Sequence, residues 1–302
     1  MSANTRRSVF GAVAALCVLA VAMAAVSASE TDPFSGVDGV VASDVADRIA
    51  DSPDRDREIR SLPANAPFDY QIGGDYEPRA GTQVVARDWF GGTALTSGYS
   101  ICYVNAFQTQ QDSDGVDRPD ERSNWPTALV LSGFEDDPNW AGEYLIDIST
   151  DSKRVAAADH LDQMIEVCAA KGFDAVEYDN LDSWTRLSDL PFGQPEAVAF
   201  AEIITDRAHA LGLAVAQKNT AAFDAATSLD VIGFDFAVVE ECGVFTECDR
   251  FTEVFGEAVV AVEYTQRGFD AACEAIGASV SVVRRDLFVT SPASTGYVFD
   301  EC

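Results

Sequence analysis

Short apolar runs alternate with amphipathic stretches along most of the chain. Apolar residues recur at helical spacing over about residues 152–171, before Gly172, and again over about 195–212. Each of these stretches is followed at once by an apolar segment, 173–178 and 213–217, of the kind that forms a buried strand. Two consecutive helix–strand units predict a parallel sheet.

Seven further segments have strand character. They are residues 68–72, 83–86, 100–104, 144–148, 234–239, 259–262 and 279–283. With the two segments above they make nine candidates, so we expect one to be misassigned or additional in an eight-stranded barrel.

Nearly every candidate strand ends in a polar residue. These residues are Asp88, Asn105, Asp147, Asp179, Asn180, Lys218, Asn219, Glu240 and Glu263. A barrel gathers the carboxyl ends of its strands on one face, where its active site lies. The pattern therefore favours an α/β fold with a single (β/α)8 TIM-type barrel. A doubly wound dinucleotide fold is less consistent, because no G-x-G-x-x-G follows the first strand.

The N-terminus has the features of an export signal. Arg6 and Arg7 precede an apolar run over 9–26, which ends in small residues around Ala28. The alternative, a membrane anchor, is less consistent with a short, Ala-rich run. We therefore predict a Sec or Tat signal peptide over 1–28 and a secreted or cell-surface protein.

The remaining chain divides at about residue 65. Residues 29–65 are acidic and poor in large apolar groups, and they predict a flexible leader with one short helix near 41–49. Residues 66–302 then form the barrel domain, whose length suits that fold. Two small domains would need an internal linker, and the sequence contains no obvious one. We expect no membrane span after signal removal, and a monomer.

The net charge of −30 arises from 50 acidic and 20 basic residues. Such a chain is not expected to bind nucleic acid, which requires neutralisation of phosphates. It would attract a cationic partner. Adaptation to high salt is the simpler explanation for most of the charge, and the two explanations are compatible.

Six cysteines follow the signal, and they are Cys102, Cys168, Cys242, Cys248, Cys273 and Cys302. An even number in an exported chain predicts disulfides, although six cysteines allow 15 pairings. Cys242 and Cys248 flank one short loop and are the best local pair. A metal site is a poor alternative, because no C-x-x-C occurs and the two histidines, His160 and His209, lie in helical stretches. We expect no metal or other cofactor.

Carboxylates at the strand ends suggest hydrolysis of a glycosidic bond, which needs two carboxyl groups. Glu177 and Asp179 are two residues apart and point the same way from one strand, and Glu240 and Glu263 end two others. Any one of them could instead cap a helix or lie on the acidic surface. Their repeated placement at strand ends favours a catalytic role.

Other side chains near the same strand ends could assist. Asn180, Lys218 and Asn219 supply hydrogen-bond donors. A buried lysine would hold one carboxylate ionised, although an ordinary structural ion pair is an equally good interpretation. Trp89 and Trp184 follow strand ends closely and could stack on sugars, whereas Trp125 and Trp140 are equally consistent with loop packing.

At these residues the chain resembles glycoside hydrolase family 114, the endo-α-1,4-polygalactosaminidase family. The matching segments occur in family order and are 68–74, 101–105, 144–148, 171–180, 217–219, 234–242, 247–249 and 262–264. The resemblance implies a (β/α)8 barrel whose catalytic pair lies in D-x-D-N and N-E-x-C motifs. Carried over, these positions are Asp179 and Glu240. By analogy with other barrel α-glycosidases, Asp179 would be the nucleophile or charge stabiliser and Glu240 the general acid/base.

The sequence departs from the family pattern at three positions. Glu177 stands where Asp is common, Tyr178 replaces a usual Pro, and Val239 replaces a usual Asn. The last two are expected to reshape the sugar site and to affect substrate identity more than reaction type.

The resemblance further implies an endo-acting hydrolase of a cationic polymer, partly deacetylated α-1,4-linked galactosamine. The candidate substrate-binding residues are Asp88, Tyr103, Asn105, Asp147, Glu177, Asn180, Trp184, Lys218, Asn219, Glu263 and Tyr264. Two alternatives remain, a hydrolase of another α-linked glycan on the same barrel and a non-catalytic glycan-binding protein. A metal-dependent deacetylase is disfavoured because the histidines it needs are missing.

Overall fold

The computed structural model describes residues 58–110 and 125–302. The predicted signal peptide, most of the predicted leader and the short helix expected near 41–49 lie outside the described residues. Leu62 and Ala66 are buried together with Phe68, so the chain joins the core before the first strand begins.

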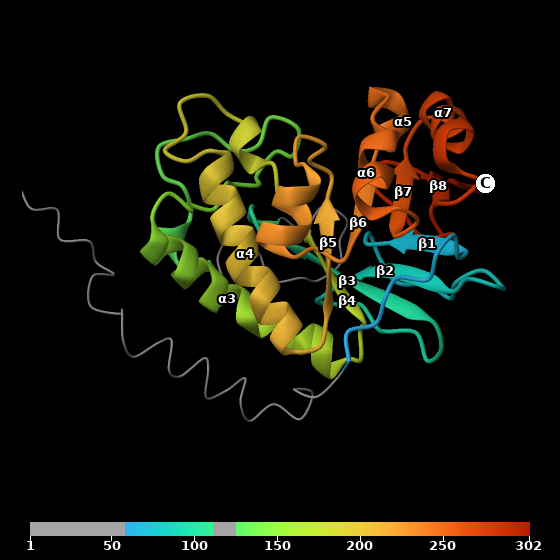
Figure 1. Cartoon of the computed structure of the whole chain (residues 1–302), viewed down its shortest axis with the longest axis horizontal. Coiled ribbons are helices and arrows are strands. Elements are labelled where there is room, and N and C mark those ends of the chain that lie inside the picture. Colours follow the sequence, from blue (N-terminus) through green and yellow to red (C-terminus); the bar gives the residue numbers. More distant parts are fainter. Residues whose placement is uncertain (1–57, 111–124) are drawn as a thin grey trace, which may run out of the picture.

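Eight parallel strands form the sheet, and each pairs with the next one along the chain (Figure 1). They are β1 (Phe68–Gln71), β2 (Val84–Asp88), β3 (Tyr99–Asn105), β4 (Ala175–Asp179), β5 (Ala214–Lys218), β6 (Phe236–Glu240), β7 (Val259–Glu263) and β8 (Ser281–Arg285). A ninth strand, β9 (Phe299–Glu301), pairs antiparallel with β8.

The sheet curls until β8 lies beside β1. Ser281 Oγ donates a hydrogen bond of 2.5 Å to the Ala66 carbonyl, and Arg285 Nη1 lies 3.4 Å from Asp69 Oδ1. Arg285 and Asp69 are both fully buried, so the ion pair is part of the seam between the first and last parallel strands. The predicted TIM-type barrel is thereby confirmed.

One of the nine candidate strands was wrong. Residues 144–148 form only isolated antiparallel bridges, Leu145 with Gln108 and Ile146 with Val130. The apolar side chains of Leu145, Ile146 and Ile148 are nevertheless buried in the core. The apolar run therefore reflects a loop packed beneath a helix, and the eight remaining candidates match the eight parallel strands.

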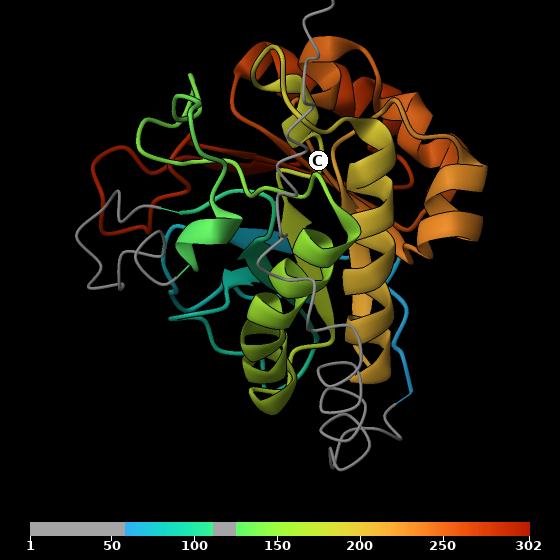
Figure 2. The same ribbon diagram turned by 90° about the vertical axis from the view of Figure 1, so that its left-hand side faces the viewer.

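Helices cover the outside of the barrel unevenly. The longer ones are α3 (Asp151–Ala170), α4 (Gln194–Ala210), α6 (Cys248–Phe255) and α7 (Gln266–Ile276), and the short ones are α5 (Cys242–Phe245), the π-helix η3 (Ala226–Ile232), and the 3-10 turns η1 (Thr127–Leu129) and η2 (Ser183–Thr185). Helices α3 and α4 pack side by side, and α5, α6 and α7 cover β6 to β8 (Figures 1 and 2). The described connections after β1 and β2 contain no helix.

Alternation along the strands decides which side chains enter the barrel. Ile101, Ala175, Ala216 and Val238 belong to one buried cluster with Tyr70 in the interior of the sheet. Residues an even number of positions further along each strand point the same way. The polar residues at the ends of β3 to β6 that share this register are Tyr103, Asn105, Glu177, Asp179, Lys218 and Glu240. Their side chains are therefore directed into the barrel mouth.

Three disulfides join the six cysteines. Cys102 on β3 pairs with Cys168 on α3, Cys273 on α7 pairs with Cys302, and Cys242 pairs with Cys248 around the α5 turn, as their spacing suggested. Disulfides of this number fit an oxidising compartment. None of the helices in the described part of the chain combines the length and apolar content needed to cross a bilayer.

The spans that these disulfides close predict different contributions to stability. Cys102–Cys168 closes 66 residues and Cys242–Cys248 only 6. In the chain-entropy model, the Cys102→Ala/Cys168→Ala variant should lose about 4 kcal/mol of unfolding free energy, and Cys242→Ala/Cys248→Ala about 2 kcal/mol. Urea unfolding of both variants measures this difference. Equal losses, or the reverse order, would contradict the entropic explanation.

Candidate active site

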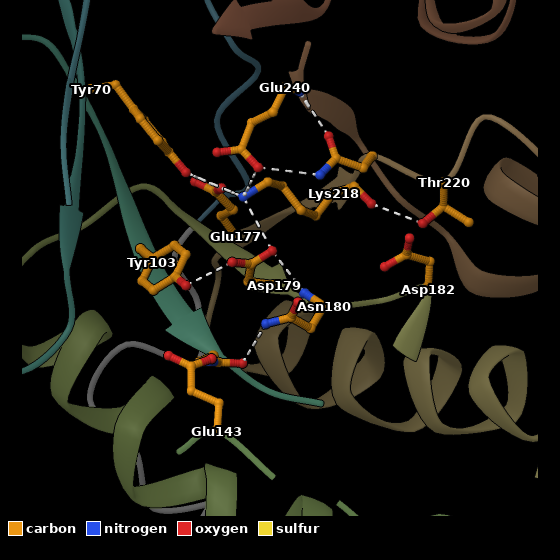
Figure 3. A network of polar contacts seen from close by, with 12 residues as sticks. Tyr70, Tyr103, Glu143, Glu177, Asp179, Asn180, Asp182, Lys218, Thr220 and Glu240 are labelled. Carbon is orange, nitrogen blue, oxygen red and sulfur yellow. Dashed lines mark hydrogen bonds and ion pairs between the residues drawn. The ribbon is translucent and has the colours of Figure 1, made fainter. Parts of the chain in front are cut away.

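A buried lysine lies at the centre of the barrel mouth. Lys218 ends β5, its side chain is 1% exposed, and Figure 3 shows its ammonium group among three carboxylates. Its Nζ lies 2.8 Å from Glu177 Oε1, 3.2 Å from Asp179 Oδ1 and 3.3 Å from Glu240 Oε2. These groups meet because β4, β5 and β6 are adjacent in the sheet.

A tyrosine hydroxyl also contacts each of two of these carboxylates, Asp179 and Glu240. Tyr103 Oη donates a hydrogen bond of 2.7 Å to Asp179 Oδ2, and Tyr264 Oη donates to Glu240 Oε1. Asn219 adds a donor to Glu240 Oε2 at 3.3 Å. Asp179 and Glu240 therefore have the same arrangement, with one oxygen facing a tyrosine hydroxyl and the other facing Lys218.

Exposure separates these two carboxylates from the third. The side chains of Asp179 and Glu240 are 18% and 21% exposed, whereas that of Glu177 is fully buried. The oxygens of Asp179 and Glu240 that face Lys218 are at most 6.5 Å apart, the sum of their distances to its nitrogen. The pair is close enough to act on one bond, and Glu177 lies beneath it as a structural counter-ion.

Charge and burial set the ionisation of the cluster. Burial alone would raise the pKa of Asp179, but the Lys218 ammonium and the Tyr103 hydroxyl outweigh it and hold that pKa below its ordinary value. Burial raises the pKa of Glu177 despite the opposing effect of Lys218. Burial would lower the pKa of Lys218, yet Asp179, Glu177 and Glu240 together raise it above the ordinary value. Lys218 therefore remains a cation, and Asp179 remains an anion.

The chain leaves three consecutive strands through left-handed backbone conformations. Asn180 after β4 has a φ of 60°, Asn219 after β5 has 47°, and Glu241 after β6 has 56°. Asparagine tolerates this region better than most residues, and a glutamate there is uncommon. These turns explain why an asparagine follows Asp179 at the end of β4 and Lys218 at the end of β5.

Two cavities open at this mouth. The smaller, about 150 Å³, is lined by Tyr103, Asp179, Asn180, Asn219, Glu240 and Tyr264 among the predicted residues. The larger, about 1220 Å³, shares Asn219, Glu240 and Tyr264 with the first and adds the predicted Trp184. The two cavities thus adjoin along shared residues that include the carboxylates Glu143 and Glu240.

Three predicted binding residues lie just behind this lining. Glu177 and Lys218 are beneath the carboxylate pair and line neither cavity. Asn105 accepts a hydrogen bond of 3.0 Å from Asn180 and donates one of 3.2 Å to Glu143 Oε2. Their geometry suits positioning of the cavity-lining groups.

Asp88 and Asp147 are elsewhere, and this corrects the prediction. Asp88 Oδ1 accepts the backbone N–H of Phe90 in the turn after β2. Asp147 accepts hydrogen bonds from Ser149 and, at 2.7 Å, from Lys153 near the start of α3. Neither residue lines either cavity, and Asp147 lies within the segment 144–148 that proved not to be a strand.

Glu263 faces away from the mouth, which is a further correction. Val260 and Val262 of β7 point into the barrel, so Glu263 points outward to the helices. Its Oε1 accepts the backbone N–H of Gly243 at 2.6 Å, and Oε2 has no hydrogen-bond partner within the described residues. Burial raises the pKa of Glu263 to about 7. Glu263 approaches Cys242 and Cys248 closely enough for a metal, but their sulfur atoms are bonded to each other.

The departures at Tyr178 and Val239 also face outward. The Tyr178 hydroxyl is buried and donates to the Ile204 carbonyl of α4 at 3.1 Å. Val239 is fully buried in the cluster beneath α6 and α7. Neither side chain enters the mouth, because odd and even strand positions point to opposite faces.

Several lining residues were not predicted as binding residues. They are Trp140, Glu143, Arg186, Glu241, Phe245, Glu247, Leu287 and Phe288. Trp140 and Phe288 form an edge-to-face pair across two loops, with ring centroids 6.5 Å apart. Loop residues carry no periodic signal, so only the tryptophan, which commonly stacks on sugars, could have suggested itself.

Comparison with known proteins agrees with the barrel fold. The model of glycoside-hydrolase family GH114 matches residues 50–302. The crystal structure of Aspergillus fumigatus Ega3 in complex with galactosamine superposes with a TM-score of 0.64 and 19% identity, covering 81% of this chain and 97% of Ega3. The glycoside hydrolase domain of PelA from Pseudomonas aeruginosa gives 0.52 and 12%, covering 78% and 98%. No curated protein matches the chain in sequence.

The outward-facing Glu263 predicts a pH-dependent stability. Folding raises its pKa from 4.5 to about 7, so the folded protein retains a proton that the unfolded chain releases. The resulting stabilisation is complete below about pH 4.5 and is lost as the pH rises through 7. Between pH 5 and pH 8 the wild type should lose about 2 kcal/mol more unfolding free energy than Glu263→Gln, which cannot ionise. Urea unfolding at both pH values measures the difference. Equal losses of unfolding free energy in wild type and Glu263→Gln would contradict the raised pKa of Glu263.

Proposed function

This chain is a glycoside hydrolase of family GH114, and we propose that it cleaves a galactosamine-type polysaccharide internally with Asp179 and Glu240 as its catalytic carboxylates. The single observation that carries the proposal is the placement of these two side chains. They are the partly exposed carboxylates on either side of Lys218, where the two cavities meet.

Asp179 suits the role of nucleophile or charge stabiliser. Such a group must be ionised at the start of the reaction. Lys218 and Tyr103 favour the ionised form and fix its orientation, since they contact different oxygens of the same carboxylate. Asp179 lines only the small cavity, where the reacting sugar unit would lie.

Glu240 suits the role of general acid/base. It lines both cavities, so a chain that crosses from one to the other passes its carboxyl group. Tyr264 and Asn219 hold that group in one orientation. Proton transfer to the leaving oxygen requires such a positioned carboxyl on the side of the departing chain.

Three observations support a cationic polymer as the substrate. The protein carries a net charge of −30. The cavities are lined by Glu143, Asp182, Glu241 and Glu247 besides the proposed pair. Ega3, which shares the fold, has been solved with galactosamine. The extent of the larger cavity supports binding of several units of a chain, and with it internal cleavage.

We further propose an exported, monomeric protein. A signal peptide over 1–28, a leader over 29–65 and a catalytic domain over 66–302 would account for the basic and apolar N-terminus and for the acidic stretch after it. The three disulfides support folding in an oxidising compartment.

Hydrolysis of de-N-acetylated galactosaminan by the mature protein tests this function. Wild type should release shortened amino-sugar oligomers, and Asp179→Asn and Glu240→Gln should each lower kcat about 1000-fold, because each removes a group required in the transition state. Asp147→Asn is the matched control, since this carboxylate contacts Lys153 outside both cavities and its loss should leave kcat unchanged.

Two outcomes would redirect the assignment. Cleavage of a neutral α-linked glycan, with galactosaminan left intact, would retain the hydrolase and overturn the substrate. Binding of a glycan by folded wild type without cleavage would leave a barrel that only binds sugar.

A further inference from the structure

The larger cavity has one wall that the catalytic pair does not explain. This wall is formed by the loop that the Cys242–Cys248 disulfide closes, and it contributes Glu241, Phe245 and Glu247 to the lining. We refer to residues 241–248 as the clipped loop. It follows β6 directly, so it begins next to Glu240.

The clipped loop is held in one conformation. The backbone N–H of Glu241 donates to the Val262 carbonyl at 2.9 Å, and that of Gly243 donates to Glu263 Oε1 at 2.6 Å. The Glu247 N–H returns to the Cys242 carbonyl at 2.9 Å. With the disulfide, these bonds fix the side chains on a rigid base, which reduces the entropic cost of binding a ligand.

Phe245 is the most exposed large apolar side chain of the described residues, at 66%. It lines the larger cavity rather than a featureless surface. Exposure of a phenylalanine costs burial free energy that an occupant of the cavity would recover. The apolar face of a sugar ring is such an occupant, and an ammonium group near the ring adds a favourable cation–π contact.

The two glutamates on either side of Phe245 form no close ion pair, although Arg250 is near enough to Glu247 to oppose the rise in its pKa that burial and Asp182 cause. Among the described residues, neither Glu241 nor Glu247 forms an ion pair with a basic side chain. Arg186, the one arginine in the lining, is already paired with Asp182 at 2.9 Å and Asp137 at 3.3 Å. Burial raises the pKa of Glu241, and so does neighbouring Glu240. A bound cation would relieve this accumulation of negative charge.

We propose that the clipped loop is a distal subsite for a deacetylated hexosamine unit, which packs its ring on Phe245 and places its ammonium group between Glu241 and Glu247. This subsite rests on the proposed function, because the unit belongs to the chain that crosses Glu240. An N-acetylated unit offers no charge to these carboxylates. The loop therefore selects for a free amine away from the bond that is cleaved.

Equilibrium binding tests the subsite separately from hydrolysis. The probes are a fully deacetylated α-1,4-linked galactosamine oligomer and the same oligomer after chemical N-acetylation. Calorimetry in an Asp179→Asn background keeps the oligomers intact. Glu241→Gln and Glu247→Gln should each weaken the Kd for the deacetylated oligomer about fivefold, and Phe245→Ala about threefold. Of these three variants, only Phe245→Ala should change the Kd for the acetylated oligomer.

Glu253→Gln is the matched control, because it removes the same charge from an exposed position on α6 outside the cavity. Its Kd should equal that of the background. Unchanged affinity in the Glu241 and Glu247 variants, or equal losses for both oligomers, would overturn the subsite. The subsite would also be overturned if the protein bound neither oligomer. Wild type that binds selectively through these residues but does not cleave would retain the subsite and contradict the proposed hydrolysis.

Discussion

The buried ammonium group of Lys218 is the constraint on which the barrel mouth depends. An ammonium group excluded from water is stable only when anions and acceptors surround it. Glu177, Asp179 and Glu240 provide this environment, all within 3.3 Å of Nζ. Glu177 is buried and fixed from below, which leaves the other two carboxylates partly exposed at the surface of the mouth. The requirement to compensate one charge thus places a pair of carboxylates side by side.

The sheet supplies this arrangement through adjacency and register. Neighbouring strands β4, β5 and β6 end at one level, and alternation directs Asp179, Lys218 and Glu240 to the same face. Asn180, Asn219 and Glu241, whose backbones are in the left-handed conformation, then turn the chain away from the barrel mouth. Tyr103 and Tyr264 arrive from β3 and from the end of β7, so five neighbouring strands contribute to holding the pair.

Periodicity and strand-end chemistry were sufficient to predict the barrel and much of the mouth. They identified all eight parallel strands and the neighbourhood of Asp179, Lys218 and Glu240, because apolar periodicity and polar strand ends are both local features of the sequence. They failed at 144–148, where an apolar run packs as a loop, and at Glu263, where strand alternation reverses the direction of the side chain. The same alternation could have indicated from the sequence that Tyr178 and Val239 face the helices.

Loop walls could not be predicted in this way. Trp140 and Phe288 come from segments far apart in the chain and meet only when the barrel closes. Glu241 and Phe245 depend on a disulfide-closed turn whose direction no periodic pattern encodes. The proposed subsite therefore lies in a part of the molecule that local sequence patterns describe least, whereas the proposed catalytic pair lies in the part they describe best.

The pH profile of kcat/KM for galactosaminan, compared between wild type and Lys218→Met, tests the central claim most directly. Lys218 holds the pKa of Asp179 below its ordinary value, so its removal should move the acidic limb of the profile to higher pH. The Glu177→Gln/Lys218→Met variant removes the buried partner as well, and it should show the same displacement in a chain without an uncompensated Glu177. An acidic limb that stays in place in both folded variants would contradict the account, because Lys218 would then not control the ionisation of the proposed catalytic pair.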